Sequence, residues 1–302
     1  MADTHDPVRQ LAVLQMSLRS DKRQIGFLLG AGCPMSVKGA DGNPLILDIK
    51  GMTEAIITTV KKKEAFEAAL NAALKHFEED ERPAPTIEDL LTHLRSLRAV
   101  AGKAGARSLS AQTIDDLDKE LCEQIHQLTN KQLSKKGTPY HGLAKWADGK
   151  RRGFPVEVFT TNYDLLVEQA LEDQRVPYFD GFAGGRKPFF DLRAMEEDEI
   201  PDRWVRLWKL HGSINWFQDS DNGVCRGPAD SKDSVQRVIH PSHLKYQQSR
   251  RLPYLAMMDK LRSFFRKETA ILVIVGYSFR DEHINEIIVQ GLRASPGSVA
   301  FA

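Results

Sequence analysis

The chain has 302 residues, and its 42 Lys and Arg residues against 41 Asp and Glu residues leave a net charge of +1, which gives no general attraction to nucleic acid or an anionic membrane. With 41% hydrophobic residues, no apolar run near the ~20 residues of a bilayer span and no basic leader before an apolar core, we expect a soluble chain without a secretory signal. The three cysteines are odd in number and far apart, which favours a reducing compartment, so we expect a cytoplasmic protein.

The first predicted elements are a short helix and a buried strand. Asp6-Pro7 is typical of a helix start, with Asp as the N-cap and Pro in the first turn. The strand Gln24–Leu29 then runs directly into a glycine-rich turn, Gly30 to Ser36, where a nucleotide phosphate can approach the backbone closely. The G-x-G-x-x-G fingerprint is incomplete because Met35 holds the place of the third glycine, so a tight turn without a ligand stays an open alternative.

The segment from Met52 to about Gly149 has mostly helical patterns. Apolar residues recur at helical spacing, and Thr86 to Asp89 resembles a capping box in front of one such stripe. The stripes are Phe66, Leu70, Leu74 and Phe77, then Leu90, Leu91, Leu94 and Leu97, then Ile114, Leu117, Leu121 and Ile125. We therefore predict an inserted helical subdomain at residues 52–137, within a Rossmann-like domain formed by residues 1–51 and 138–302.

Three more apolar strands each end in a small or polar corner. Val156 to Thr161 precedes Asn162-Tyr163-Asp164, Trp204 to Leu210 precedes His211-Gly212-Ser213, and Ile271 to Val275 precedes Gly276-Tyr277-Ser278. Residues 181–185 are expected to form a loop, 188–201 an irregular segment, and 219–232 a surface loop or hairpin. A last strand begins at Ser298, and we expect the polypeptide to continue beyond Ala302.

These elements predict an α/β fold with a Rossmann-like, mostly parallel sheet and helices on both faces. In such a sheet the carboxyl ends of the strands lie along one edge, where ligands bind. Taken singly, His211 is better explained as a strand-end histidine bonded to a backbone carbonyl, and Asn162 is equally explained as an Asx turn. It is the convergence of four corners that favours a binding site.

In order and spacing, the motifs resemble the bacterial sirtuin-like branch of the sirtuin superfamily over nearly the whole chain. The residues that carry this likeness are Gly30-Ala31-Gly32 with Ser36, Thr160 to Asp164, Leu210 to Ser213, and Val275 to Asp281. The resemblance implies a sheet that binds NAD+ as substrate at its carboxyl edge, and cleavage of the bond between nicotinamide and ribose.

The resemblance also implies roles for individual residues. Asn162 would position the ribose and the attacking water, Asp164 would lie near the nicotinamide carboxamide, and His211 would accept a proton from a ribose hydroxyl. A histidine has a suitable intrinsic pKa for such base catalysis near neutral pH. The implied NAD-binding residues are Gly30, Ala31, Gly32, Cys33, Ser36, Thr161, Gly212, Ser213, Gly276, Tyr277 and Ser278.

One departure from the sirtuin pattern concerns zinc. Protein-deacylating sirtuins carry a ribbon of four cysteines, whereas the corresponding interval here contains only Cys225, so we expect no zinc ribbon and no metal. Adding His240 and His243 to Cys225 does not produce a standard metal-binding spacing.

Tyr163 and Arg280-Asp281 resemble the branch of the family that hydrolyses NAD+ itself, and this resemblance implies an NAD+ glycohydrolase effector that depletes NAD+ in abortive-infection defence against phage. The resemblance also implies a homo-oligomer and a partner protein or fused domain that senses infection. An NAD-dependent protein deacylase or ADP-ribosyltransferase, and a non-catalytic NAD or ADP-ribose sensor, stay open as alternatives.

Overall fold

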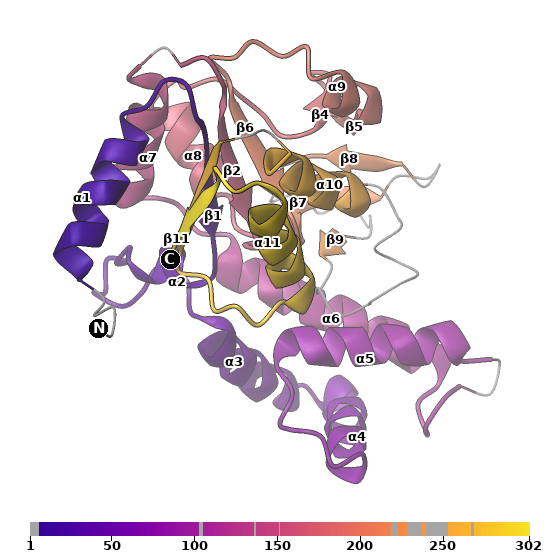
Figure 1. Ribbon diagram of the computed structural model, residues 1–302. Helices are drawn as coiled ribbons and strands as arrows, with labels where there is room; N and C mark the ends of the chain where they lie inside the picture. Colours follow the sequence, from indigo (N-terminus) through magenta and orange to yellow (C-terminus); the bar gives the residue numbers. More distant parts are fainter. Residues whose placement is uncertain are drawn as a thin grey trace.

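The computed structural model describes residues 6–102, 105–135, 137–150, 152–218, 223–228, 253–266 and 269–302, and the backbone of 237–239. Its centre is a six-stranded parallel sheet in the order β11-β10-β1-β2-β6-β3 (Figure 1). The strands are β1 (Gln24–Leu29), β2 (Val156–Thr160), β3 (Tyr178–Phe179), β6 (Val205–Lys209), β10 (Ala270–Val275) and β11 (Val299–Phe301). The predicted α/β fold is confirmed.

The sheet has a hydrophobic core on each face, as expected of parallel strands. In β1, Ile25 and Leu29 belong to one core while Leu28 belongs to the other. The first core contains residues of α7 (Pro139–Asp148) and α8 (Leu166–Asp173), and the second contains residues of α10 (Tyr254–Phe264) and α11 (Glu282–Ala294). The prediction of helices on both faces is therefore confirmed, and Figure 1 shows the two helix layers on either side of the strands.

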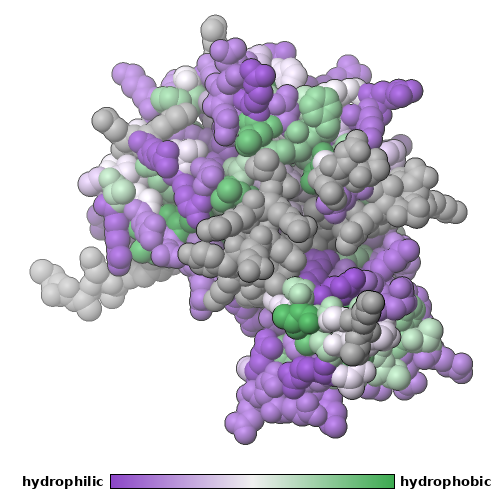
Figure 2. Space-filling view, turned by 90° about the vertical axis from the view of Figure 1, so that its right-hand side faces the viewer, coloured by the Kyte–Doolittle hydropathy of each residue, from purple (hydrophilic) through white to green (hydrophobic). Residues whose placement is uncertain are grey.

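Apart from α7, which packs against the sheet, the helices between β1 and β2 form the lower part of the molecule in Figure 1. They are α3 (Ile49–Lys61), α4 (Glu64–Glu79), α5 (Ile87–Val100) and α6 (Ala111–Thr129), preceded by the short α2 (Gly32–Met35). The predicted capping box is present at the start of α5, where Thr86 and Asp89 bond each other's backbone amides. The apolar stripes of α4 and α5 face the core, and Figure 2 shows hydrophilic residues at the lower end of the molecule with smaller apolar patches beside them. The division of the chain into a domain and a subdomain stays a prediction.

The N-terminal helix also follows its sequence pattern. In α1 (Pro7–Leu18), Asp6 Oδ1 accepts hydrogen bonds from the amides of Val8 and Arg9, at 3.0 and 3.2 Å. Within the described parts of the chain, no helix is both long enough and apolar enough to cross a membrane.

A second, five-stranded antiparallel sheet was not predicted. Its order is β4-β5-β8-β7-β9, and its strands are β4 (Phe182–Ala183), β5 (Phe189–Phe190), β7 (Gly212–Gln218), β8 (Val224–Arg226) and β9 (Arg237–Ile239). The expected loop at 181–185 thus contains β4, and the expected irregular segment at 188–201 contains β5 and the helix α9 (Leu192–Glu197). Strands of two or three residues have too little periodicity to predict locally, because their partners lie far away in the chain.

Candidate active site

A pocket of about 750 Å³ lies at the carboxyl edge of the parallel sheet. Its wall combines the turns after β1, β2, β6 and β10 with residues from α2 and from the starts of α3 and α5. From the predicted site, the lining residues are Ala31, Gly32, Thr161, Asn162, Asp164, His211, Gly276, Tyr277 and Ser278. The four strand ends that the sequence analysis singled out therefore contribute to one pocket.

The turns after β1 and β10 pack backbone against backbone. Gly30 N donates to Val275 O at 2.9 Å, and Gly32 N donates to Gly276 O at 2.8 Å. A Cβ atom on Gly30 would stand 2.4 Å from Gly276 O, and Gly276 itself has a φ of +62°. Side chains are thus excluded from this contact, which explains the glycines before any ligand is considered.

Two other side chains of the glycine-rich turn stabilise the turn through hydrogen bonds to backbone carbonyls. The buried Cys33 Sγ donates to Val275 O at 3.0 Å, and Ser36 Oγ donates to Cys33 O at 2.7 Å. Burial raises the pKa of the Cys33 thiol to about 11, so it stays protonated near neutral pH. Any contact of Cys33 or Ser36 with NAD+ stays a prediction.

Asn162 stands where the first two strand ends meet. Its Nδ2 donates to Gly30 O at 3.0 Å, and its backbone amide donates to Thr160 Oγ1 at 3.1 Å. The side-chain amide is therefore held at the pocket wall by the glycine-rich turn rather than free to rotate.

Asp164 is a buried carboxyl group at the same corner. Its Oδ1 accepts a hydrogen bond from Leu166 N at 3.0 Å, at the start of α8. Burial raises the pKa of Asp164 to about 6, although the nearby Lys209 ammonium opposes the shift. Lys209 is itself buried, and it donates to the Asp164 carbonyl and, at 3.0 Å, to Glu168 Oε1.

His211 follows β6 and is paired with a carboxylate. Its Nε2 lies 3.0 Å from Asp281 Oδ2, and both side chains are buried. Its Nδ1 is buried without a hydrogen-bond partner among the residues that the structure describes. This arrangement differs from a strand-end histidine bonded to a carbonyl, and it leaves one ring nitrogen for a ligand.

Gly212 and Ser213 lie behind this corner, in the first residues of β7. Ser213 is fully buried, and its Oγ donates to Tyr163 O at 3.4 Å. A role of these two residues in NAD binding stays a prediction.

Residues 156–302 match the model of the SIR2-like domain. The chain contains a SIR2-like domain. No curated protein matches the chain with statistical significance. The match implies NAD-related activity with NAD as a ligand, and it confirms the sirtuin-like resemblance.

The SIR2-like domain contributes most of the polar residues of the pocket. Asn162, Asp164, His211 and Asp281 all lie within the matched range, whereas the glycine-rich turn after β1 precedes it. Where the structure describes the chain, no group of three or more His, Cys, Asp or Glu side chains is placed to hold a metal ion. His240 and His243 lie outside the described residues.

Several pocket residues were missed by the sequence analysis. Asp281 belongs to the motif that carries the resemblance, and its position as the residue before a helical stripe marks it as an N-cap. Asp48, Thr86 and Glu88 come from the starts of α3 and α5, and no local pattern indicates that these helix ends face the strand ends.

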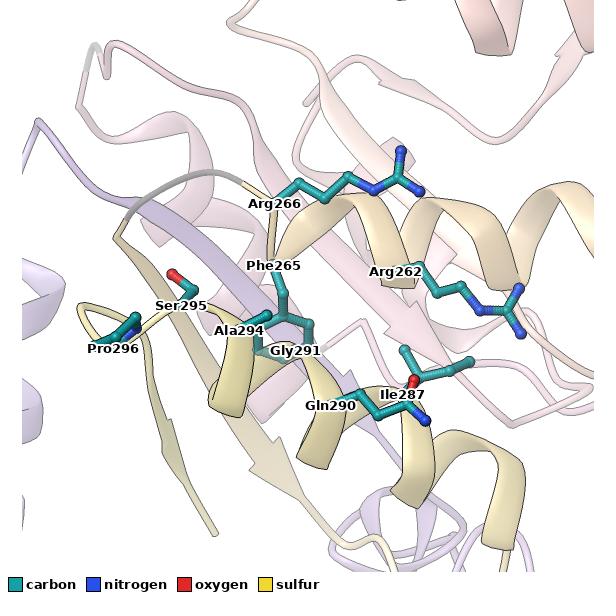
Figure 3. Close-up of a pocket in the computed structure, with 9 residues that line it drawn as sticks. All are labelled: Arg262, Phe265, Arg266, Ile287, Gln290, Gly291, Ala294, Ser295 and Pro296. Carbon is teal, nitrogen blue, oxygen red and sulfur yellow. The ribbon is translucent and has the colours of Figure 1, made fainter.

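A second pocket, of about 610 Å³, lies between α10 and α11 of the SIR2-like domain (Figure 3). Arg262 and Arg266 of the α10 side and Gln290 of α11 surround it, with Phe265 and Ile287 among its apolar lining. None of the predicted site residues lines this second pocket, whereas nine of them line the first.

Proposed function

We propose that the chain is an NAD+ glycohydrolase domain that cleaves NAD+ to nicotinamide and ADP-ribose. The observation that carries the proposal is the placement of Asn162 and His211 on one pocket, at the ends of the adjacent strands β2 and β6. The ring of His211 is held by a buried carboxylate, and Asn162 is held by Gly30. Positioned groups of this kind accelerate reactions because their geometry is set before the substrate binds.

The size and chemistry of the pocket suit a dinucleotide. Its volume of about 750 Å³ is within the usual range of small-molecule sites. The close-packed turns at Gly32 and Gly276 bring backbone to the pocket wall, where a pyrophosphate can approach. Lys50 and Arg280 also line the pocket and supply positive charge for that group.

In the proposed reaction, the bond between C1′ of the ribose and the nicotinamide nitrogen breaks. Its electron pair returns to the pyridine ring and neutralises the positive charge of the leaving nicotinamide. A water molecule held by Asn162 forms the new bond to C1′, and its proton passes through His211 to solvent. Water is consumed, and nicotinamide, ADP-ribose and one proton are released.

Asp164 is assigned to the nicotinamide carboxamide. With a pKa of about 6, raised by burial, it is present in both the protonated and the ionised forms near neutral pH. It can therefore donate a hydrogen bond to the amide oxygen or accept one from the amide nitrogen.

The number and placement of the cysteines favour NAD+ hydrolysis over protein deacylation. The chain has three cysteines, too few for a four-cysteine zinc ribbon. Cys33, Cys122 and Cys225 are also buried at separate places in the fold. We further propose that NAD+ depletion serves abortive infection, and that a homo-oligomer or an infection-sensing partner controls the activity.

The test is nicotinamide release from NAD+ by purified protein. We expect Asn162→Ala and His211→Ala each to lower the rate on the order of 10²-fold or more. The matched controls are Asn71→Ala on the exposed surface of α4 and His283→Ala on α11, which should keep the wild-type rate.

Release that survives both site substitutions would contradict the site assignment. NAD+ binding without release, with and without candidate partners, would favour the sensor function. ADP-ribose found on an added protein instead of in solution would favour the transferase.

A further inference from the structure

The His211–Asp281 pair has a directional geometry. Because a carboxylate only accepts hydrogen bonds, the 3.0 Å contact requires that His211 Nε2 carries the proton. We infer that Asp281 is a positioning residue that selects the Nε2–H tautomer of His211 and leaves Nδ1 as the nitrogen that accepts a proton. The tautomer assignment stands on geometry alone, and its catalytic consequence rests on the proposed function.

Asp281 is itself fixed in orientation by the start of α11. Its Oδ1 accepts hydrogen bonds from His283 N at 3.0 Å and from Ile284 N at 3.2 Å, as an N-cap does. Tyr277 Oη also donates to Asp281 O at 3.2 Å. Because Oδ1 is bonded to the two helix amides, the orientation of the carboxylate is fixed and Oδ2 faces His211.

The charge state of Asp281 supports the same orientation. Burial alone would raise the pKa of this carboxyl, but the hydrogen bond and charge of His211 and the two helix amides outweigh it and lower the pKa. Asp281 is therefore ionised at neutral pH and acts as an acceptor. A carboxylate in this position also stabilises the imidazolium that forms when Nδ1 takes up a proton.

The other ring nitrogen of His211, Nδ1, is available to a substrate. His211 Nδ1 is buried without a partner among the described residues, and the His211 side chain lines the pocket. A buried acceptor left without a partner costs stability. A hydroxyl or water of the substrate complex would satisfy it, which is the contact required of a general base.

One substitution separates the two oxygens of Asp281. In Asp281→Asn, the amide oxygen keeps the cap of α11, because Asn is a good N-cap. The amide NH2 group then takes the place of Oδ2 and donates to His211 Nε2. A neutral ring must respond by carrying its proton on Nδ1, so the base becomes a donor.

The experiment is nitrogen NMR of protein with 15N-labelled histidine, in which the His211 signals are assigned by their loss in His211→Ala. We expect the Nε2–H tautomer in the wild type and the Nδ1–H tautomer in Asp281→Asn. Nicotinamide release should fall on the order of 10²- to 10⁴-fold in the variant. The matched control is Asp191→Asn, which changes the N-cap of α9 and should leave both the tautomer and the rate as in the wild type.

Either an Nδ1–H tautomer in the wild type or an unchanged tautomer in Asp281→Asn would overturn the inference. The spectrum tests Asp281 even if the protein releases no nicotinamide, so failure of the inference and failure of the proposed function are distinguishable. Should Asp281→Asn not fold, Asp281→Ser retains a capping hydroxyl and lacks the acceptor toward Nε2. It should then show a mixture of tautomers, and a retained Nε2–H form would contradict the role of Asp281.

Discussion

Tyr163 Oη donates a 2.8 Å hydrogen bond to Glu88 Oε1, and this contact links the corner after β2 to the first turn of α5. Burial, together with the neighbouring Glu88, raises the pKa of Tyr163 well above its usual value, so the phenol stays a donor at neutral pH. Both residues line the pocket at the carboxyl edge of the parallel sheet. Helix α5 is therefore joined to the strand edge at the pocket itself.

Removing this hydroxyl in Tyr163→Phe should lower the free energy of unfolding by about 1–3 kcal/mol, because the acceptor is charged and the donor is buried. Urea unfolding measures the change. Tyr178→Phe is the matched control, since Tyr178 Oη donates to Glu172 Oε1 at 2.9 Å in an exposed pair. Equal losses of unfolding free energy in the two variants would contradict a larger stabilising effect of the buried Tyr163 contact.

Gly291 is a position where a methyl group has no room. Its Cβ would stand 2.4 Å from Phe265 Cγ, between α10 and α11 (Figure 3). Overpacking should make Gly291→Ala about 1–3 kcal/mol less stable by thermal or urea unfolding, despite the helix propensity of Ala. Gly142→Ala in α7 is the control, because nothing lies within 4 Å of its Cβ, and it should gain up to about 1 kcal/mol. A stabilised Gly291→Ala would contradict the packing argument.

The raised pKa of Asp164 predicts a pH-dependent stability. The folded state holds this proton up to about pH 6, while the unfolded state releases it near 3.8, so the Asp164 contribution destabilises the fold as pH rises through that window. Asp164→Asn should therefore gain stability relative to the wild type between pH 4 and pH 7, by on the order of 2 kcal/mol. Urea unfolding of both proteins at the two pH values gives the difference directly. If the stability advantage of Asp164→Asn over the wild type became smaller as pH rises, the raised pKa of Asp164 would be contradicted.

Lys209 and Glu168 form a buried ion pair of 3.0 Å beneath the pocket. Lys209→Met leaves the Glu168 carboxylate without its charged partner, and we expect a loss of about 3–5 kcal/mol in unfolding free energy. The double variant Lys209→Met/Glu168→Gln should recover part of this loss, because it removes both charges.

The control for this pair is Lys63→Met. Lys63 pairs with Glu120 at 2.7 Å, but its side chain is 42% exposed, so the cost should stay within about 1 kcal/mol. A similar loss for Lys63→Met and Lys209→Met would contradict the importance of burial.

Local patterns were sufficient to predict the principal strands of the parallel sheet and most of the helices. The run Gln24–Leu29 is a strand with the expected bounds, and the capping box at Thr86 and Asp89 begins α5 as expected. These features are encoded within a few residues, because burial periodicity and cap chemistry act between near neighbours. The strand ends that share the pocket also followed from the rule for parallel sheets.

The contacts that give the site its chemistry join segments far apart in the chain. His211 and Asp281 are 70 residues apart, and Tyr163 and Glu88 are 75 residues apart. The antiparallel sheet joins strands as short as two residues, such as β4 and β5, with strands from distant parts of the chain. A local pattern can mark Asp281 as a helix cap, but only folding brings its second oxygen to His211, because side-chain pairing depends on the packing of whole elements.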